Sequence, residues 1–167
     1  MIHSPSSSGL DSMKERKRII EKEVGDGWSL YETYIGDHPA FIRVRDGMGN
    51  LIGRKGRTLR VRVTWAYGPE DSGEMPTPDQ VNGMEECENL LVEALERKEF
   101  GLLTYCSFCD GLRIWCFYCK DDMEELDKRI QRTLPHDEPF PIEFECEEDA
   151  GWNEYCNAWA HCQPAPN

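Results

Sequence analysis

Four cysteines form two closely spaced pairs whose spacing is that of zinc ligands. Cys106-x-x-Cys109 and Cys116-x-x-Cys119 each match the C-x-x-C element of tetrahedral zinc sites. Between the pairs, however, Asp110-Gly111 is a preferred two-residue turn of a β-hairpin. The sequence therefore offers two incompatible interpretations, a zinc site or a hairpin.

Strand geometry decides between them. With the turn at 110–111, alternation places Cys109 and Cys116 on one face of the hairpin and Cys106 and Cys119 on the other. The two cysteines that share a face lie four residue positions apart along the hairpin, which is about 13 Å. We therefore predict that the four cysteines do not share a metal. A redox dithiol is disfavoured as well, because Cys116 lies in mid-strand and only Cys119 approaches a helix start. Buried thiols are the favoured interpretation.

A looser cluster lies near the end of the chain, where Cys156, His161 and Cys162 fall on a predicted helix. His161 follows Cys156 by five residues and directly precedes Cys162, so neither spacing puts a base beside a nucleophile on one helical face. We name no catalytic residue, expect no cofactor, and consider an enzymatic role the less favoured one.

Acidic residues alternate with apolar ones along a predicted strand. Glu143, Glu145 and Glu147 alternate with apolar neighbours, and Glu148 and Asp149 extend the series. Carboxylates in this number could bind a divalent cation or act as acid and base. An acidic outer strand more often faces solvent and blocks edge-to-edge pairing. We favour the second interpretation and treat this strand as part of a partner surface.

Four arginines complete the predicted partner surface. Arg43, Arg45, Arg60 and Arg62 are expected to point outward from neighbouring strands, and the intervening loop adds Arg54, Lys55 and Arg57. Basic residues on such a sheet can bind single-stranded RNA, but the glycine-aromatic motif of RNA recognition is missing and the rest of the chain is acidic. Pairing with acidic residues of the same chain, or of a second copy, is favoured.

The predicted elements from Leu59 onward run strand, helix, strand, strand, helix, strand, which is the order of a ferredoxin-like α+β core. A hairpin over 28–45 precedes this core, and a short helix over 152–162 follows it. Right-handed crossovers place the Leu59 and Leu112 strands centrally and the Leu102 and Phe140 strands outside. Helices cover one face of the sheet. The N-terminal hairpin, the C-terminal helix or a partner must cover the other.

Apolar periodicity predicts the core. Thr77 caps a helix with the stripe Val81, Met84, Cys87 and Leu91. Asp121 caps a second helix, whose inner stripe is Met123, Leu126 and Ile130. On the hairpin, Leu103 is assigned to the same face as Tyr105. The residues expected to be buried are Leu59, Val61, Val63, Leu91, Leu95, Ile114, Leu126 and Ile130.

Composition indicates one domain. The chain has 167 residues and a net charge of −13, and we expect tails at 1–12 and 163–167 around a domain at 13–162. Residues 1–66 carry 12 Lys or Arg and 8 Asp or Glu, whereas residues 67–167 carry 7 and 24. This balance disfavours nucleic acid as a partner of the C-terminal half of the chain. No apolar run is long enough for a membrane span and no secretory signal is visible, so we expect a cytoplasmic protein with reduced cysteines.

Several motifs, most of them aromatic, are spread along the chain. They are Trp28-x-x-Tyr31-x-x-Tyr34-x-Gly36-x-x-Pro39-Ala40-x-Ile42-x-Val44, Thr77-Pro78, Gly111-x-Arg113, Phe117-Tyr118 and Asp149-x-x-Trp152-x-x-Tyr155. In these motifs the chain resembles a bacterial family known only as domain of unknown function 695. The resemblance spans roughly residues 27–160 and implies a cytosolic, ferredoxin-like protein with a distant likeness to protein regulators of ribonuclease E. It implies no established chemistry, and the cysteine-rich hairpin is not part of it.

These observations favour a non-catalytic acidic binding protein, a regulator or an immunity-type inhibitor of a basic protein partner. A homodimer is compatible with the same surface. The alternative is an enzyme or zinc-binding protein that uses the hairpin cysteines or the acidic strand over 143–149. Metal analysis distinguishes the two, because stoichiometric zinc would favour the alternative.

Overall fold

The computed structural model describes residues 27–69 and 75–162. The predicted tails at 1–12 and 163–167, and residues 13–26 of the predicted domain, lie outside these residues. Short 3₁₀ turns occur at Gly49–Leu51, Arg54–Gly56 and Arg97–Glu99. The main elements are β1 (Trp28–Ile35), β2 (His38–Arg45), β3 (Leu59–Ala66), α2 (Pro78–Glu96), β4 (Gly101–Cys109), β5 (Leu112–Cys119), α3 (Met123–Thr133), β6 (Ile142–Glu148) and α4 (Asn153–Cys162).

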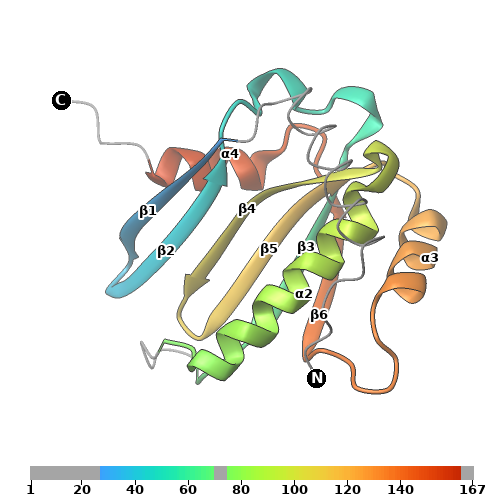
Figure 1. Cartoon of the computed structure of the whole chain (residues 1–167). Helices are drawn as coiled ribbons and strands as arrows, with labels where there is room; N and C mark the ends of the chain where they lie inside the picture. Colours follow the sequence, from blue (N-terminus) through green and yellow to red (C-terminus); the bar gives the residue numbers. More distant parts are fainter. Residues whose placement is uncertain (1–26, 70–74, 163–167) are drawn as a thin grey trace.

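The six strands form one antiparallel sheet in the order β1-β2-β4-β5-β3-β6 (Figure 1). The α+β class is confirmed, and the β4-β5-β3-β6 portion has the order expected of a ferredoxin-like core, with β3 and β5 inside. The β1–β2 hairpin adds two strands beside β4. Within the described part of the chain, no helix is long and apolar enough to cross a bilayer.

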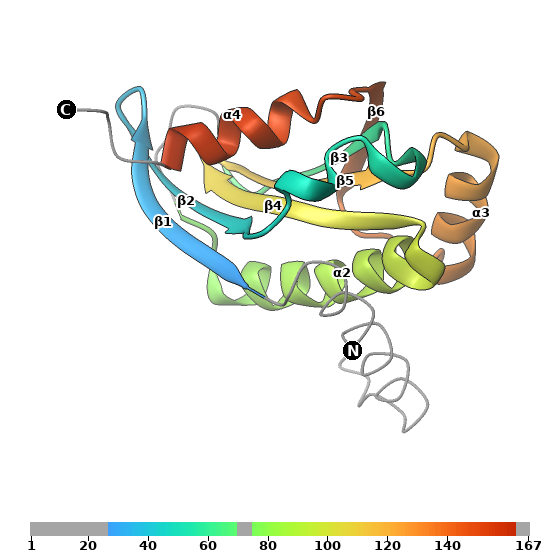
Figure 2. The same cartoon turned by 90° about the horizontal axis from the view of Figure 1, so that it is seen from above.

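Helices cover both faces of the sheet (Figure 2). Helix α2 packs on one face, with α3 beside it, and α4 packs on the other. The N-terminal hairpin, the C-terminal helix or a partner was expected to cover the second face. The helix, α4, lies there, whereas the β1–β2 hairpin adds two strands to the edge of the sheet.

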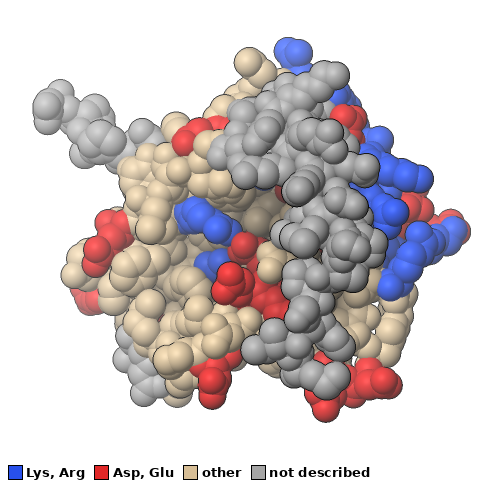
Figure 3. Space-filling view, in the orientation of Figure 1, with Lys and Arg blue, Asp and Glu red and all other residues tan. Residues whose placement is uncertain are grey.

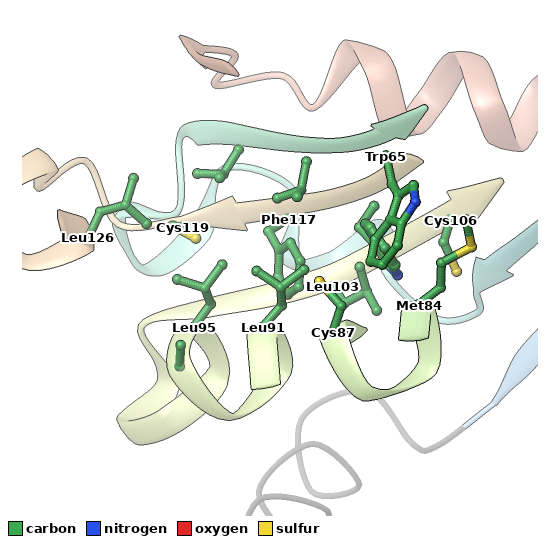
Figure 4. Packing of buried hydrophobic residues seen from close by; sticks show 14 of the residues in the cluster. Trp65, Met84, Cys87, Leu91, Leu95, Leu103, Cys106, Phe117, Cys119 and Leu126 are labelled. Atoms are coloured by element: carbon green, nitrogen blue, oxygen red, sulfur yellow. The ribbon is translucent and has the colours of Figure 1, made fainter. Parts of the chain in front are cut away.

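The core on the α2 face follows the predicted alternation along β3. Leu59, Val61 and Val63 are at most 5% exposed and meet Leu91 and Leu95 of α2, which are fully buried. Figure 4 shows these helix side chains pointing toward the sheet. Burying apolar surface on this scale contributes about 25 cal/mol per Å², so the layer is a main source of stability.

Two of the residues predicted to be buried are only partly so, and two stripe residues are exposed. Ile114 and Ile130 are half-buried at the edges of the two cores. Val81 is 39% exposed and Met123 46% exposed. Both exposed residues lie in the first turn of their helix, so periodicity alone extends the buried stripe too far toward the helix start.

The helix starts are confirmed for α2 and corrected for α3. Thr77 accepts from the Gln80 N–H at 3.2 Å while Gln80 Oε1 accepts from the Thr77 N–H at 2.9 Å, a complete capping box. In α3 the cap is Asp122 instead of Asp121, because Asp122 Oδ1 accepts from the Glu125 N–H at 3.0 Å. Either aspartate is a good N-cap residue by sequence, and the path of the chain from β5 into α3 determines which of the two caps the helix.

The central hairpin has the predicted turn but contains an unpredicted bulge. Asp110 and Gly111 both have positive φ, 54° and 78°, as the two-residue turn of a hairpin requires. Farther along β4 the register shifts at Thr104, so that Leu103 pairs with Phe117 and Tyr105 with Cys116. Leu103 therefore lies on the α2 face and not with Tyr105, which corrects the predicted face.

A buried ion pair accompanies this bulge. Arg45 Nη1 donates to Glu96 Oε1 at 3.1 Å and to the Leu103 carbonyl at 3.0 Å, and the Leu103 N–H donates to the same Glu96 oxygen at 2.9 Å. Both charged side chains are at most 5% exposed. The backbone N–H and C=O of Leu103 at the bulge are thus hydrogen-bonded by side chains from α2 and β2. These bonds hold the β1–β2 hairpin beside β4.

Candidate protein-binding edge

Strand β6 is an outer strand of the sheet and pairs with β3. Its residues alternate between the two faces. Ile142, Phe144 and Cys146 face the α2 and α3 side, and Glu143, Glu145 and Glu147 face the α4 side. The sequence has no Lys or Arg after Arg132, whereas eight Asp or Glu follow it. The edge strand thus lies in the most acidic part of the chain.

Two of the edge glutamates are held by one buried arginine. Arg60 on β3 contacts Glu145 Oε1 at 3.0 Å and Glu147 Oε2 at 3.1 Å. The Arg60 side chain is 9% exposed, and the two carboxylates are 59% and 65% exposed. The arginine therefore orients two solvent-accessible carboxylates along the edge and neutralises one charge.

Glu154 of α4 is the third carboxylate in contact with Arg60. It contacts Arg60 Nη1 at 3.3 Å and Arg62, and it accepts from the Tyr105 hydroxyl at 2.9 Å. Burial would raise the pKa of Glu154, but the hydrogen bonds from Arg62 and Tyr105 and the charge of Arg62 outweigh it and hold this pKa below its ordinary value. Glu154 is consequently an ionised carboxylate that ties α4 to the sheet.

Sequence reasoning missed Glu154 and Tyr105. A signal existed for Glu154, since it falls within the Asp149-x-x-Trp152-x-x-Tyr155 motif. Nothing in the sequence marked the Tyr105 hydroxyl as a partner of Glu154, because the contact depends on how α4 docks on the sheet.

Glu148 and Asp149, predicted to extend the acidic edge, have different positions. Glu148 pairs in register with Leu59 and so faces the α3 side, where it is exposed. Asp149 accepts from the Tyr118 hydroxyl at 2.8 Å and from the N–H groups of Asn153 and Glu154 at the start of α4. Asp149 therefore acts as a helix cap.

The four predicted arginines do not form one surface. β2 and β3 are separated by β4 and β5, so the expectation of neighbouring strands is wrong. Arg60 and Arg62 face α4. Arg43 and Arg45 face α2, where they bond Glu88 at 2.8 Å and Glu96 at 3.1 Å. All four pair with acidic residues of the same chain, as the favoured interpretation predicted.

The basic loop before β3 is likewise not a basic patch. Arg57 is fully buried, and its guanidinium donates to the Glu99 carbonyl at 3.1 and 3.3 Å. At the surface, Lys55 Nζ lies 3.8 Å from Glu99 Oε2. The Arg57 carbonyl in turn accepts from the Trp152 indole at 2.7 Å, so this loop anchors α4.

The hairpin cysteines divide between the two cores as predicted. Cys106 and Cys119 lie in the α2-face core, and Cys109 and Cys116 belong to the α4-face core. Burial raises the pKa of each of these thiols. A thiolate is therefore disfavoured at all four positions. Among the described residues, no group of three or more His, Cys, Asp or Glu is arranged to hold a metal ion.

The C-terminal cluster is also separated. Cys162 is buried against the sheet, and His161 is exposed with its Nε2 3.1 Å from the Tyr34 carbonyl. Cys156 Sγ lies 3.8 Å from the Gly151 carbonyl. None of these contacts joins the histidine to a thiol.

The protein is of the α+β class, and an acidic strand, β6, forms one edge of its sheet. A sequence profile described as a family of unknown function (DUF695) matches residues 26–158, and the chain belongs to that family. No curated protein and no solved structure shows significant similarity to the chain.

Proposed function

We propose that this protein is a non-catalytic binding protein whose acidic edge strand holds a basic segment of a partner protein. The single observation that carries the proposal is the position of β6, an outer strand with Glu143, Glu145 and Glu147 exposed on one face. Regulation or immunity-type inhibition of the partner is the corresponding role, in the bacterial cytoplasm. The likeness to regulators of ribonuclease E stays a prediction.

The edge offers three kinds of contact to an extended segment. Backbone N–H and C=O groups of an outer strand can pair with an added strand. The carboxylates on the α4 side suit Lys or Arg at alternate positions of that strand. On the other face, a cavity of about 190 Å³ suits an apolar residue of the added strand. Its lining is mostly apolar and consists of Ile130, Leu134, Pro135, Pro139, Phe140, Ile142 and Phe144, together with Gln131 and His136.

Orientation of the carboxylates favours binding. Because Arg60 already bonds Glu145 and Glu147, these side chains lose less rotamer freedom when a partner docks. Among the described residues, Glu143 makes no ion pair, so it retains its full charge for a partner cation. An acidic edge also repels other copies of itself, which directs pairing toward basic segments.

A salt-eluted pull-down from the native host tests the proposal with two matched variants. Glu143→Lys reverses a charge on the edge, and Glu86→Lys makes the same change on the exposed face of α2. We expect a basic protein to be retained by the wild type and by Glu86→Lys, lost with Glu143→Lys, and released as salt rises. Retention that is equal for both variants, or insensitive to salt, would refute the proposal.

A further inference from the structure

A second surface feature lies on the opposite side of the molecule from the α4 network. It is a cavity of about 340 Å³ at the N-terminal half of α2, on the sheet face that α2 covers only in part. Figure 3 views this face and shows basic and acidic side chains next to each other in its central hollow. The lining residues are Leu30, Phe41, Arg43, Met75, Phe108 and Arg113.

Two arginines of this cavity share one carboxylate oxygen. Arg43 Nη2 donates to Glu88 Oε1 at 2.8 Å and Arg113 Nη2 donates to the same oxygen at 3.0 Å. Trp115 Nε1 donates to it as well, at 2.9 Å. The cluster therefore holds two cations and one anion, a net charge of +1 on a strongly acidic protein.

The guanidinium groups retain unused donors. Arg113 Nε is buried and has no hydrogen-bond partner among the described residues. Arg43 Nε reaches only the weak acceptor Cys106 Sγ, at 3.2 Å. A buried donor without a good acceptor is costly, and an anionic ligand would supply the missing acceptors.

Aromatic rings hold both cations in place. The Arg113 Cζ lies 4.1 Å from the centroid of Phe108 and 5.2 Å from that of Trp115. The Arg43 Cζ lies 4.7 Å from the centroid of Trp28. Cation–π contacts of this kind restrain the guanidinium groups before a ligand arrives, which lowers the entropy lost on binding.

The rim of the cavity is apolar and exposed. Leu30 is 73% exposed and Met75 is 50% exposed, although both are large hydrophobic side chains. Phe41 and Phe108 continue this apolar lining inward toward the arginines. A volume near 340 Å³ is at the small end of the range for small-molecule sites.

From this arrangement we infer that the cavity binds a small monocarboxylate with an apolar ring, its carboxylate on Arg43 and Arg113 and its ring against Leu30, Phe41 and Phe108. The single net positive charge and the apolar walls suit a singly charged carboxylate better than a doubly charged phosphate. This site is distinct from the β6 edge and does not depend on its proposed role.

Calorimetric titration of the full-length protein with 3-phenylpropionate is the first test. The neutral 3-phenylpropanamide has the same shape without the charge, and acetate has the carboxylate without the ring. We expect 3-phenylpropionate to bind at least about 10-fold more tightly than either. The amide lacks the charge-assisted hydrogen bonds, which are worth at least that factor, and acetate lacks the apolar ring, whose burial is worth about 10-fold or more in affinity. Equal affinity for the amide, or no measurable binding of 3-phenylpropionate at millimolar concentration, would overturn the inference.

Matched variants on one strand locate the site. Leu30→Glu places a negative charge at the rim, and Ile35→Glu makes the same change at an exposed position on the other face of β1. Both side chains are at least 45% exposed, so neither change removes a core residue. Affinity should fall about 10-fold or more with Leu30→Glu and stay unchanged with Ile35→Glu. Equal effects of the two variants would place binding elsewhere and refute the site.

Discussion

The indole ring of Trp152 stacks on the phenol ring of Tyr118, with centroids 4.5 Å apart and planes inclined by 14°. Trp152 is fully buried and its φ is +51°, a conformation that bulky residues rarely adopt. Stacking, together with the hydrogen bond to Arg57, holds it there. The pair joins the start of α4 to β5, beside the hydrogen bonds of Asp149 and the ion pairs of Glu154.

Removing this ring should destabilise the protein strongly. Trp152→Ala is expected to lower the free energy of unfolding by about 3–5 kcal/mol, because it leaves a large cavity between α4 and β5. Urea unfolding followed by circular dichroism measures this loss. Trp159→Ala, at a half-buried position within α4, is the control and should cost clearly less. Similar losses for the two variants would contradict the assigned role of the stack.

The α2 core gives a second stability prediction. Leu91 of α2 and Val63 of β3 are fully buried in the same core. Truncating either to Ala should lower the free energy of unfolding by about 2–4 kcal/mol. Val81→Ala should change stability by less than about 0.5 kcal/mol, since Val81 is 39% exposed. Urea midpoints for the three variants test this ranking. A large loss at Val81 would show that the first turn of α2 packs more closely than described.

Local rules explain what the sequence predicted correctly. The Asp110-Gly111 turn and the Thr77 capping box are determined by residues close in sequence, so the hairpin register and the start of α2 followed from them. The alternation along β3 likewise identified its buried face, because a strand with one polar face has only one register that buries the other.

Long-range pairing explains what the sequence did not predict. The partners of Arg43 and Arg45 are glutamates of α2, and they depend on β2 docking beside β4, which no local signal specifies. The bulge at Thr104 has no sequence signature either, and it exchanged the face assigned to Leu103. The acidic strand was located correctly. The spacing of its residues, however, did not predict which carboxylates pair with Arg60.

Cysteine reactivity gives a third prediction. Burial raises the pKa of Cys87 to about 12, and Cys106, Cys116 and Cys119 are fully buried. These four thiols should therefore react slowly with iodoacetamide in the native protein, and quickly once urea unfolds it. Mass spectrometry of labelled peptides locates the modified residues.

The half-buried thiols serve as the internal control in that experiment. Cys109, Cys146 and Cys156 are partly accessible and should be labelled first. Rapid labelling of Cys106 or Cys116 in the native protein would contradict the structure and would revive a redox role for the hairpin.

The last prediction concerns pH and Glu154. Its pKa is lowered in the folded protein by Arg62 and Tyr105, which outweigh the opposing effect of burial. A carboxyl whose pKa is lower in the folded than in the unfolded state stabilises the fold fully above its unfolded pKa, about 4.3 for Glu. That contribution is lost as the pH falls from there through the lower folded pKa.

Glu154→Gln should therefore reduce stability at pH 7 by about 1–3 kcal/mol, because a charge-assisted acceptor is lost from a largely buried network. The difference from wild type should shrink near pH 3, because the carboxyl is protonated in the unfolded state below its pKa of about 4.3 and the wild-type advantage falls with pH from there. Urea unfolding at the two pH values measures it. Glu124→Gln is the control, since its side chain is 82% exposed, and it should behave as wild type at both. A deficit for Glu154→Gln that is equally large at pH 3 would mean that packing, and not the ionised carboxylate, joins α4 to the arginines of β3.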